Sequence, residues 1–350
     1  MQEVLADSTK KVLVASHRGD WHHFPENSIP AIQSCIEGGI DIVEIDVRET
    51  KDGHFVLMHD ETIDRTTNGK GAVSGYTLQQ LKKFKLKNRN GSLSEHTIPS
   101  LDSALLICKN KILVNLDKSS GKFSELKIIV DSLQCSNFVI LKGGGNAKFF
   151  RELNTLSSGI LYMPIVNTSS KNLYDYIKNS EAPLIEFLIK TDTSPYLIDL
   201  FLDSLEAENC KIWYNPLFSG ISGGHNESEN AIDAWNWFLN KNAYVIQTDY
   251  PFELLTFLIE KNLHSKPFDF QPIPLDKLPS KQKPETKKED SQKNQTKKPE
   301  SQTKWYTVKS GDSLSRIAAR NKTTLKTILK LNPKLSENST LRIGQKIRIK

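Results

Sequence analysis

Short runs of hydrophobic and β-branched residues alternate along most of the chain with longer stretches in which apolar residues recur every three or four positions. The short runs predict buried strands, and the longer stretches predict amphipathic helices such as 29–37, 101–109 and 252–260. The expected strands are 12–16, 42–47, 112–116, 138–141, 159–166, 184–189, 211–214 and 243–248. Eight such strand–helix units predict an α/β fold, a closed (β/α)8 TIM barrel, in which chemistry lies at the carboxyl ends of the strands.

Three regions depart from this alternation. Residues 66–99 are rich in Gly, Lys and Asn, with one short helical stretch, and predict a small insertion over the barrel mouth. Residues 275–303 are dominated by Lys, Pro, Glu, Ser, Gln and Thr, a composition that predicts a disordered linker. Residues 304–350 regain an apolar pattern and predict a small α+β module of order βααβ. We therefore expect a barrel domain over 1–274, followed by the linker and the module.

The formal net charge of +6 is distributed unevenly. Residues 1–275 carry 27 Lys and Arg against 34 Asp and Glu, residues 276–304 carry nine Lys against five acids, and residues 305–350 carry eleven basic residues against two acids. The acidic barrel has no electrostatic reason to bind nucleic acid. The basic tail suits an acidic polymer, such as nucleic acid, an anionic membrane surface or a cell-wall glycan. In the linker, the charge is equally compatible with a merely solubilising role.

The cysteines and the apolar runs argue against a zinc-binding protein and a membrane-spanning protein. The four cysteines are scattered, without the short spacing or neighbouring histidines of a zinc site, and are expected to be buried: Cys35, Cys108, Cys135 and Cys210. No apolar run approaches the ~20 residues of a membrane helix. Residues 1–11 lack the apolar core of a signal peptide, which indicates the cytoplasm if Met1 is the native start. A chain whose signal peptide had been removed would instead belong to the cell envelope, periplasmic or extracellular.

Ionisable residues follow the first two predicted strands. The first strand leads into His17-Arg18-Gly19, which supplies an imidazole that can move a proton and a guanidinium that can bind phosphate. Alone, this motif more often marks a packed histidine beside a surface arginine. The second strand places Glu44 and Asp46 at alternate positions, on one face, where buried carboxylates need a cation or a basic partner. Oxygen ligands alone favour Mg²⁺ or Ca²⁺ over zinc.

Two further residues extend this group. His59 follows the apolar run 56–58 and supplies a second imidazole, enough for acid–base hydrolysis. Asp117 follows the strand 112–116 and can complete a metal site.

These motifs resemble those of the glycerophosphodiester phosphodiesterase family. The matching segments occur in the order and spacing of that family: His17-Arg18-Gly19, Pro25-Glu26-Asn27-Ser28, Glu44-x-Asp46 and His59-Asp60. The stretches 212–215 and 246–249 are similar to its final strands, so the resemblance runs from about Val12 to His264.

The resemblance implies metal-dependent hydrolysis of glycerophosphodiesters to glycerol 3-phosphate and an alcohol. One divalent cation, Ca²⁺ or Mg²⁺, would be held by Glu44, Asp46 and Asp117. His17 and His59 would be the acid–base pair: one takes the proton of the glycerol 2-hydroxyl, which attacks phosphorus, the other protonates the departing alcohol, and water opens the cyclic phosphate. Direct attack by a metal-activated water is the alternative, and the sequence does not identify which histidine is the base.

Phosphate binding is implied for Arg18, but a departure affects its expected lysine partner. Many relatives carry a lysine two residues after the acid of the third strand, whereas here Lys118 directly follows Asp117. Adjacent strand residues point to opposite faces, so Lys142, at the end of the fourth strand, is the candidate replacement.

Other residues near the predicted site are less specific. Glu26 and Asn27 are expected to orient the metal site. Trp213, at a strand end, is equally compatible with an apolar wall for the substrate and with the core. The remaining histidines in the first half of the chain are assigned to surface or loop packing: His22, His23, His54 and His96.

The C-terminal module resembles a LysM domain. The match rests on residues 305–318, on Leu331-Asn332-Pro333 and on 341–347. It implies binding to N-acetylglucosamine-containing glycans, chiefly peptidoglycan, in a shallow groove beside two helices. The residues expected to line that groove are Gly311, Asp312, Ser313, Asn332 and Pro333. A general interaction module is the alternative.

The favoured interpretation is an envelope hydrolase that the LysM module anchors to peptidoglycan. A phospholipase-D-like or phosphoinositide-cleaving enzyme acting on intact lipids would share the barrel and metal, but the polar insertion at 66–99 does not favour it. An inactive glycan-binding adaptor is the third possibility, and the presence of both histidines and all three acids argues against it. No nucleic-acid partner and no transmembrane segment are expected.

Overall fold

The computed structural model describes residues 12–156, 159–167, 173–188, 199–215 and 231–264 of the larger part of the chain. In the C-terminal module it describes residues 305–308, 314, 317–318, 321, 323–332, 335 and 346–349. The chain divides into two compact units, Met1–Lys283 and Pro284–Lys350. Among the described residues, no helix combines the length and apolar character needed to cross a membrane. The predicted linker 275–303 lies outside the described residues.

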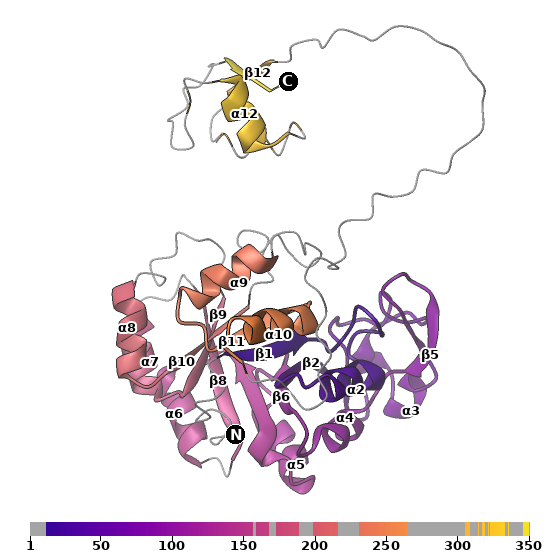
Figure 1. Cartoon of the computed structure of the whole chain (residues 1–350). Coiled ribbons are helices and arrows are strands. Elements are labelled where there is room, and N and C mark those ends of the chain that lie inside the picture. The colour runs from indigo at the N-terminus through magenta and orange to yellow at the C-terminus, as the bar shows by residue number, and fades with distance from the viewer. Residues whose placement is uncertain are drawn as a thin grey trace, which may run out of the picture. The chain divides into compact units, whose positions relative to one another are not determined.

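Eight parallel strands form a closed barrel in the first unit (Figure 1). They are β1 (Leu13–His17), β2 (Ile42–Glu49), β6 (Leu113–Asp117), β7 (Val139–Gly143), β8 (Leu161–Asn167), β9 (Leu184–Leu188), β10 (Lys211–Tyr214) and β11 (Val245–Thr248). Their order is β1-β11-β10-β9-β8-β7-β6-β2, and pairing of β1 with β2 closes the ring. Each predicted strand overlaps one of these, which confirms the TIM barrel.

A helix follows each barrel strand and packs on the outside of the ring (Figure 1). The helices are α2 (Ile29–Glu37), α4 (Leu101–Cys108), α5 (Phe123–Ser132), α6 (Ala147–Leu156), α7 (Leu173–Ser180), α8 (Asp199–Ala207), α9 (Ala231–Leu239) and α10 (Pro251–Glu260). Helix α2 shows how sequence sets a boundary, because the Ser28 side chain caps it by accepting from the Ala31 backbone N–H and a proline lies in its first turn. The strands and the inner faces of the helices form one hydrophobic core.

The insertion predicted at 66–99 forms a small structure beside the barrel. Strand β3 (Phe55–Leu57) comes before the insertion in the chain and pairs antiparallel with β2. The insertion holds the short 3-10 helix η1 (Val73–Gly75), α3 (Leu78–Leu81) and the hairpin of β4 (Lys85–Lys87) with β5 (Leu93–Thr97). The insertion and the segment 56–63 that precedes it share an apolar cluster separate from the barrel core: Val56, Met58, Ile63, Val73, Leu81, Leu86 and Ile98. The hairpin is a feature that the sequence pattern did not predict.

The C-terminal module pairs its first and last strands, as predicted. Strand β12 (Trp305–Thr307) is antiparallel to β13 (Lys346–Arg348), and α12 (Leu325–Leu331) is the second predicted helix. A small core includes Ile317, Ile328 and Ile347.

The turn after β1 constrains the backbone at the point where the barrel carries its first polar residues. Arg18 and Gly19 both adopt left-handed conformations, with φ of 57° and 73°. A Cβ on Gly19 would lie 2.9 Å from the Ala31 Cβ of α2. Only glycine meets both requirements, because its left-handed backbone is unstrained and it has no side chain to collide with the helix.

We therefore expect Gly19→Ala to destabilise the barrel more than Gly53→Ala. Gly53 has a similar φ of 78°, but a Cβ there would have no neighbour within 4 Å. Both changes introduce backbone strain of about 1 to 2 kcal/mol, and only Gly19→Ala adds a steric cost of about 1 to 3 kcal/mol. Denaturant unfolding measures the two losses, and equal losses would contradict this account of the turn.

Candidate active site

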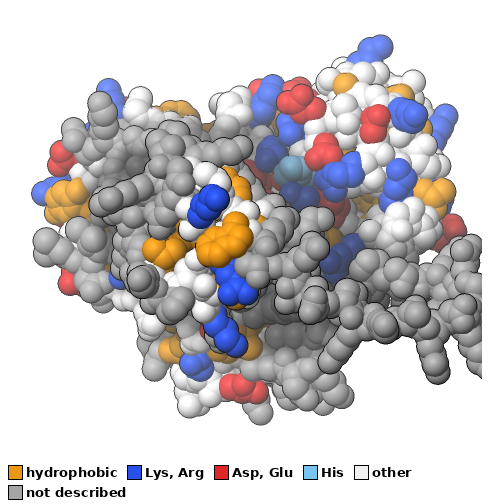
Figure 2. All heavy atoms as spheres, turned by 90° about the horizontal axis from the view of Figure 1, so that it is seen from above, with side chains coloured by type: hydrophobic (Ala, Val, Ile, Leu, Met, Phe, Trp, Pro, Cys, Tyr) orange, Lys and Arg blue, Asp and Glu red, His pale blue; other side chains and the backbone are white. Residues whose placement is uncertain are grey.

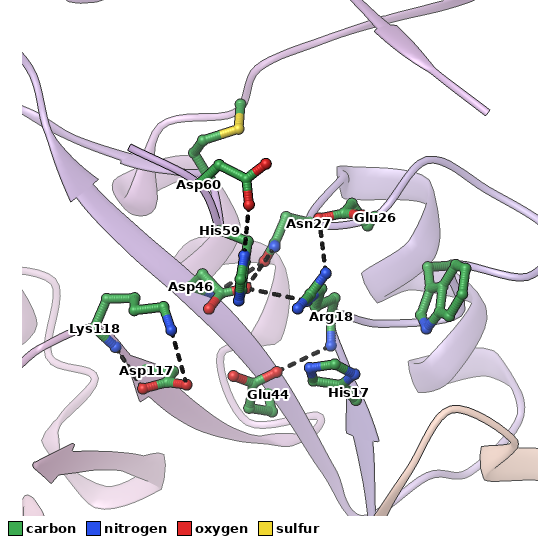
Figure 3. Close-up of polar contacts among 12 residues, drawn as sticks. His17, Arg18, Glu26, Asn27, Glu44, Asp46, His59, Asp60, Asp117 and Lys118 are labelled. Atoms are coloured by element: carbon green, nitrogen blue, oxygen red, sulfur yellow. Dashed lines mark hydrogen bonds and ion pairs between the residues drawn. The ribbon is translucent and has the colours of Figure 1, made fainter. Parts of the chain in front are cut away.

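Acidic side chains from two neighbouring strands converge at the carboxyl end of the barrel (Figure 3). Glu44 and Asp46 lie on β2, and Asp117 ends β6 in register with Asp46. Carboxylate oxygens of the three residues lie within 4.8 Å of one another, and among the described residues this is the one group of three or more potential metal ligands. The structure thus brings together the three acids that the sequence predicted as ligands.

The buried oxygens of this group suit a hard divalent cation. Glu44 and Asp46 have no exposed surface. Glu44 Oε1 and Asp46 Oδ1 are buried without a hydrogen-bond partner among the described residues. Burial, and then the neighbouring charge of Asp46, raise the pKa of Glu44 well above its usual value. Such oxygens are costly unless a cation binds them, and an all-oxygen set fits Mg²⁺ or Ca²⁺.

Asn27 holds one of these carboxylates in place. Its Nδ2 donates to Asp46 Oδ2 at 2.8 Å, and the Asp46 backbone N–H donates to Asn27 Oδ1 at 2.9 Å. The Asn27 backbone N–H donates in turn to the Arg18 carbonyl, and Asn27 adopts a left-handed φ of 54°. These bonds occupy Asp46 Oδ2 and leave Oδ1 for another ligand, which is the geometry that the predicted orienting role requires.

Arg18 lies beside the acids and is held in place by Glu26, the residue before Asn27. Its Nε lies 3.6 Å from Asp46 Oδ2, and its Nη1 donates to Glu26 Oε1 at 3.2 Å. Its backbone N–H donates to Glu44 Oε2. Glu26 also accepts two bonds from Arg65, at 2.6 and 2.9 Å. The guanidinium of Arg18 is therefore fixed at the edge of the acid group.

The same arginine, Arg65, connects this network to the second histidine. Its Nε donates to Asp60 Oδ2 at 2.7 Å, and Asp60 Oδ1 lies 2.7 Å from His59 Nδ1. Because a carboxylate only accepts, His59 donates through Nδ1 and is left with Nε2 for other chemistry. Sequence reasoning missed Arg65, since no motif marks it and its partner Glu26 lies 39 positions earlier.

His17 has a comparable carboxylate partner, Asp249, from the end of the last barrel strand. Its Nδ1 lies 2.7 Å from Asp249 Oδ1, which also accepts from Trp21 Nε1 at 2.9 Å. Burial lowers the pKa of His17, although Asp249 opposes the shift. The neutral ring thus carries its proton on Nδ1, and Nε2 is the basic nitrogen. Asp249 directly follows β11, but it was not among the predicted site residues.

Lys142, the predicted replacement lysine, is buried within the acid group. Its Nζ lies 3.1 Å from Glu186 Oε2, 3.5 Å from Asp117 Oδ2 and 3.9 Å from Glu44 Oε1. Burial opposes its charge, but these acids raise its pKa, so it remains a cation. Glu186, on β9, was not predicted; its Oε1 accepts from Asn215 Nδ2 at 3.1 Å.

Lys118 corrects the strand argument. The expectation that it points away from Asp117 assumed an extended backbone, but β6 ends at Asp117 and Lys118 is left-handed, with φ of 59°. Its Nζ therefore lies 3.9 Å from Asp117 Oδ2, and both side chains are partly exposed (Figure 3). Burial would raise the pKa of Asp117, but Lys142 and then Lys118 hold it at about 2.

Trp213 is a core residue, and the alternative of a substrate wall is wrong. It has no exposed surface, and its Nε1 donates to Gln247 Oε1 at 3.2 Å. Of the histidines assigned to surface or loop packing, His23, His54 and His96 are exposed and His22 is half-buried.

The predicted glycan-binding residues fall in two groups. Gly311, Asp312, Ser313 and Pro333 lie outside the described residues. Asn332 is described, and its amide joins the end of α12 to β13 by donating to the Arg348 carbonyl and accepting from the Arg348 N–H. Its contact with glycan stays a prediction.

Comparison with known families confirms both resemblances. Residues 17–163 match the glycerophosphoryl diester phosphodiesterase family, and residues 306–350 match the LysM domain. Residues 162–258, which contain the later barrel strands, match a domain of unknown function.

Individual relatives agree with these matches. A glycerophosphodiester phosphodiesterase of Caldanaerobacter subterraneus subsp. tengcongensis is 45% identical over 113 residues, 32% of this chain and 46% of that protein. The chain thus spans about half the length of this curated relative. A structure of a glycerophosphoryl diester phosphodiesterase from Parabacteroides distasonis is similar over 74% of this chain and 92% of that chain, with a TM-score of 0.63 and 22% identity.

A second structure adds a ligand to the comparison. It is a phosphodiesterase from Oleispira antarctica in complex with the product sn-glycerol-3-phosphate, similar over 68% of this chain and 93% of that chain, with a TM-score of 0.52 and 20% identity. At these identities, the two structures show that the barrel fold is shared.

Proposed function

We propose that the barrel hydrolyses glycerophosphodiesters to glycerol 3-phosphate and an alcohol with the help of a divalent cation. The chain carries a glycerophosphoryl diester phosphodiesterase family domain and a LysM domain. The observation that carries this proposal is the group of Glu44, Asp46 and Asp117, with two buried oxygens that lack hydrogen-bond partners among the described residues. The names of the relatives and the glycerol 3-phosphate in one similar structure support the same reaction.

The charges of the site fit one divalent cation and a phosphodiester. The acids Glu44, Asp46, Asp117 and Glu186 make ionic contacts with three bases, Arg18, Lys118 and Lys142. When all are ionised, the excess is one negative charge, so one Ca²⁺ or Mg²⁺ would leave one positive charge to offset the single negative charge of a phosphodiester. Bound by the three predicted ligands, that ion would neutralise the oxygens of the substrate phosphate.

Arg18 and Lys142 are the proposed phosphate-binding residues. Arg18 can present its planar guanidinium to two phosphate oxygens, and its contacts with Glu26 and Asp46 fix the direction in which it points. Lys142 supplies a fixed charge between the carboxylates of Asp117 and Glu186.

His17 and His59 are the proposed acid–base pair. Each directs Nδ1 at a carboxylate, Asp249 or Asp60, which selects the tautomer and stabilises the protonated ring. One Nε2 would take the proton of the glycerol 2-hydroxyl as its oxygen bonds to phosphorus. The bond from phosphorus to the departing alcohol breaks, and the other histidine protonates that alcohol. Water then opens the cyclic phosphate.

The polar surroundings favour a soluble diester over an intact lipid. On the face in Figure 2, Lys, Arg, Asp and Glu side chains surround a histidine. Acyl chains would require an apolar contact surface, so cleavage of intact lipids is the less favoured activity.

We also propose that the LysM module binds peptidoglycan and keeps the enzyme in the cell envelope. The match over residues 306–350 supports glycan binding. Residues 305–350 carry eleven basic residues against two acids, a charge that suits an anionic wall polymer.

We expect metal-dependent release of glycerol 3-phosphate from glycerophosphocholine, glycerophosphoethanolamine or glycerophosphoinositol. EDTA should abolish it and Ca²⁺ or Mg²⁺ restore it. His17→Ala should lower kcat about 10²- to 10⁴-fold, because it removes a proton-transfer group. The matched control is His54→Ala. His54 is exposed, and its backbone N–H and carbonyl form hydrogen bonds with Thr50 that the substitution keeps. A folded, metal-loaded protein that hydrolyses none of these diesters would redirect the proposal to intact lipids or to a binding role.

We expect the whole chain to sediment with insoluble peptidoglycan and a chain ending at Lys283 to stay in solution. Lys283 is the end of the first compact unit, so the shorter chain should retain diesterase activity. Equal sedimentation of the two chains would assign wall binding to the barrel and contradict the role of the module.

A further inference from the structure

One guanidinium bonds two carboxylates at the mouth of the barrel. Arg65 donates from Nη1 to Glu26 Oε2 at 2.6 Å and from Nη2 to Glu26 Oε1 at 2.9 Å. It also donates from Nε to Asp60 Oδ2 at 2.7 Å and from Nη2 to Asp60 Oδ1 at 3.1 Å. We propose that Arg65 is a positioning residue that fixes the phosphate-binding Arg18 and the acid–base His59 relative to each other, an inference that rests on the proposed function.

The two carboxylates carry this constraint to the reacting groups. Glu26 Oε1 accepts from Arg18 Nη1 at 3.2 Å. Asp60 Oδ1 lies 2.7 Å from His59 Nδ1 (Figure 3). These are the two oxygens to which Arg65 Nη2 donates. A shift of this one nitrogen would therefore displace the partners of both side chains, although Arg18 follows β1 and His59 follows β3.

Arg65 also keeps both carboxylates ionised, so that each remains an acceptor. Burial would raise the pKa of Glu26, but the hydrogen bonds from Arg65 and the charge of Arg18 hold that pKa below its usual value. Hydrogen bonds from Arg65 are also the largest cause of the lowered pKa of Asp60. Without Arg65, the two carboxylates would lose the cation that they share, and the repulsion between like charges would disfavour the present geometry.

The shape of arginine is essential to this arrangement. Its Nε, Nη1 and Nη2 lie in one plane and direct a pair of donors at each carboxylate. The ammonium of a lysine is a single point of charge and cannot form two such paired contacts. Lysine at position 65 would restore the charge without restoring the geometry.

The insertion supports the backbone on both sides of Arg65. Lys87, on β4 of the insertion hairpin, donates from Nζ to the Asp64 carbonyl at 3.1 Å. Its backbone N–H donates to the Thr66 carbonyl at 2.8 Å. The residues before and after Arg65 are therefore bonded to the hairpin, which gives the insertion a part in placing the guanidinium.

Replacement of Arg65 tests this role in the metal-loaded enzyme, with the diester that the wild type hydrolyses fastest. We expect Arg65→Gln to lower kcat about 10- to 100-fold, the effect typical of residues that orient reacting groups. Arg65→Lys should recover no more than about threefold of this loss, since lysine cannot form both paired contacts. The matched control is Arg151→Gln on α6, which removes an arginine of similar exposure, 43% against 47%, and should leave kcat unchanged.

A double variant separates positioning from a general loss of stability. Asp60→Asn should also lower kcat, and its combination with Arg65→Gln should lose much less than the product of the two single losses, because both changes act on His59. Losses that multiply would show that Arg65 does not act through Asp60 and would overturn the proposal. Full kcat in Arg65→Gln, even with lower stability, or in Arg65→Lys would also overturn it.

Failure of the proposed reaction is distinguishable from failure of this role. If the wild type hydrolyses no diester, nitrogen NMR of the histidine rings still identifies their neutral tautomers, and His59→Ala assigns the signal. The wild-type His59 should hold its proton on Nδ1, which faces Asp60, and Arg65→Gln should show a mixture with the Nε2 form. A ring that keeps its Nδ1 proton in Arg65→Gln would refute the positioning role.

Discussion

The burial of like-charged carboxylates at the barrel mouth is the constraint on which the rest of the site depends. Glu44, Asp46 and Asp117 lie close together, two of them without exposed surface, and such a group is stable only if cations surround it. Lys142 supplies one charge from inside the barrel and Arg18 supplies another from the first loop. Glu44 Oε1 and Asp46 Oδ1 have no hydrogen-bond partner among the described residues, and they are the oxygens that the proposed divalent ion would bind.

The loops around this group have the conformations needed to place those partners. Arg18, Asn27 and Lys118 are non-glycine residues in the left-handed region, and all three contact the acids. Such conformations cost about 1 to 3 kcal/mol each and persist where the surrounding structure imposes them. Here the contacts with the acid group impose them. The Arg18 backbone N–H donates to Glu44, and the Asn27 side-chain amide bonds both the carboxylate and the backbone N–H of Asp46.

Local sequence patterns predicted the barrel and most of its mouth, because their information lies within a few residues. Apolar runs identified all eight strands, and alternation placed Glu44 and Asp46 on one face. Residues whose role depends on a distant partner were missed: Asp249 faces His17 from 232 positions away, and Glu186 faces Lys142 from another strand. The Lys118 error came from extending strand geometry past the end of β6, and the position of Trp213 at a strand end did not reveal its burial.

Thermal unfolding with added Ca²⁺ or Mg²⁺ tests most directly whether the acid group is a metal site, because it needs no substrate. The account predicts that EDTA-treated protein gains stability as cation is added, by about 2.7 kcal/mol at a hundredfold excess over the dissociation constant. Glu44→Gln should be at least as stable as the wild type in EDTA, since it relieves a buried charge, and should lose most of the gain. The same gain in both proteins, or no gain in the wild type with either ion, would contradict the central claim.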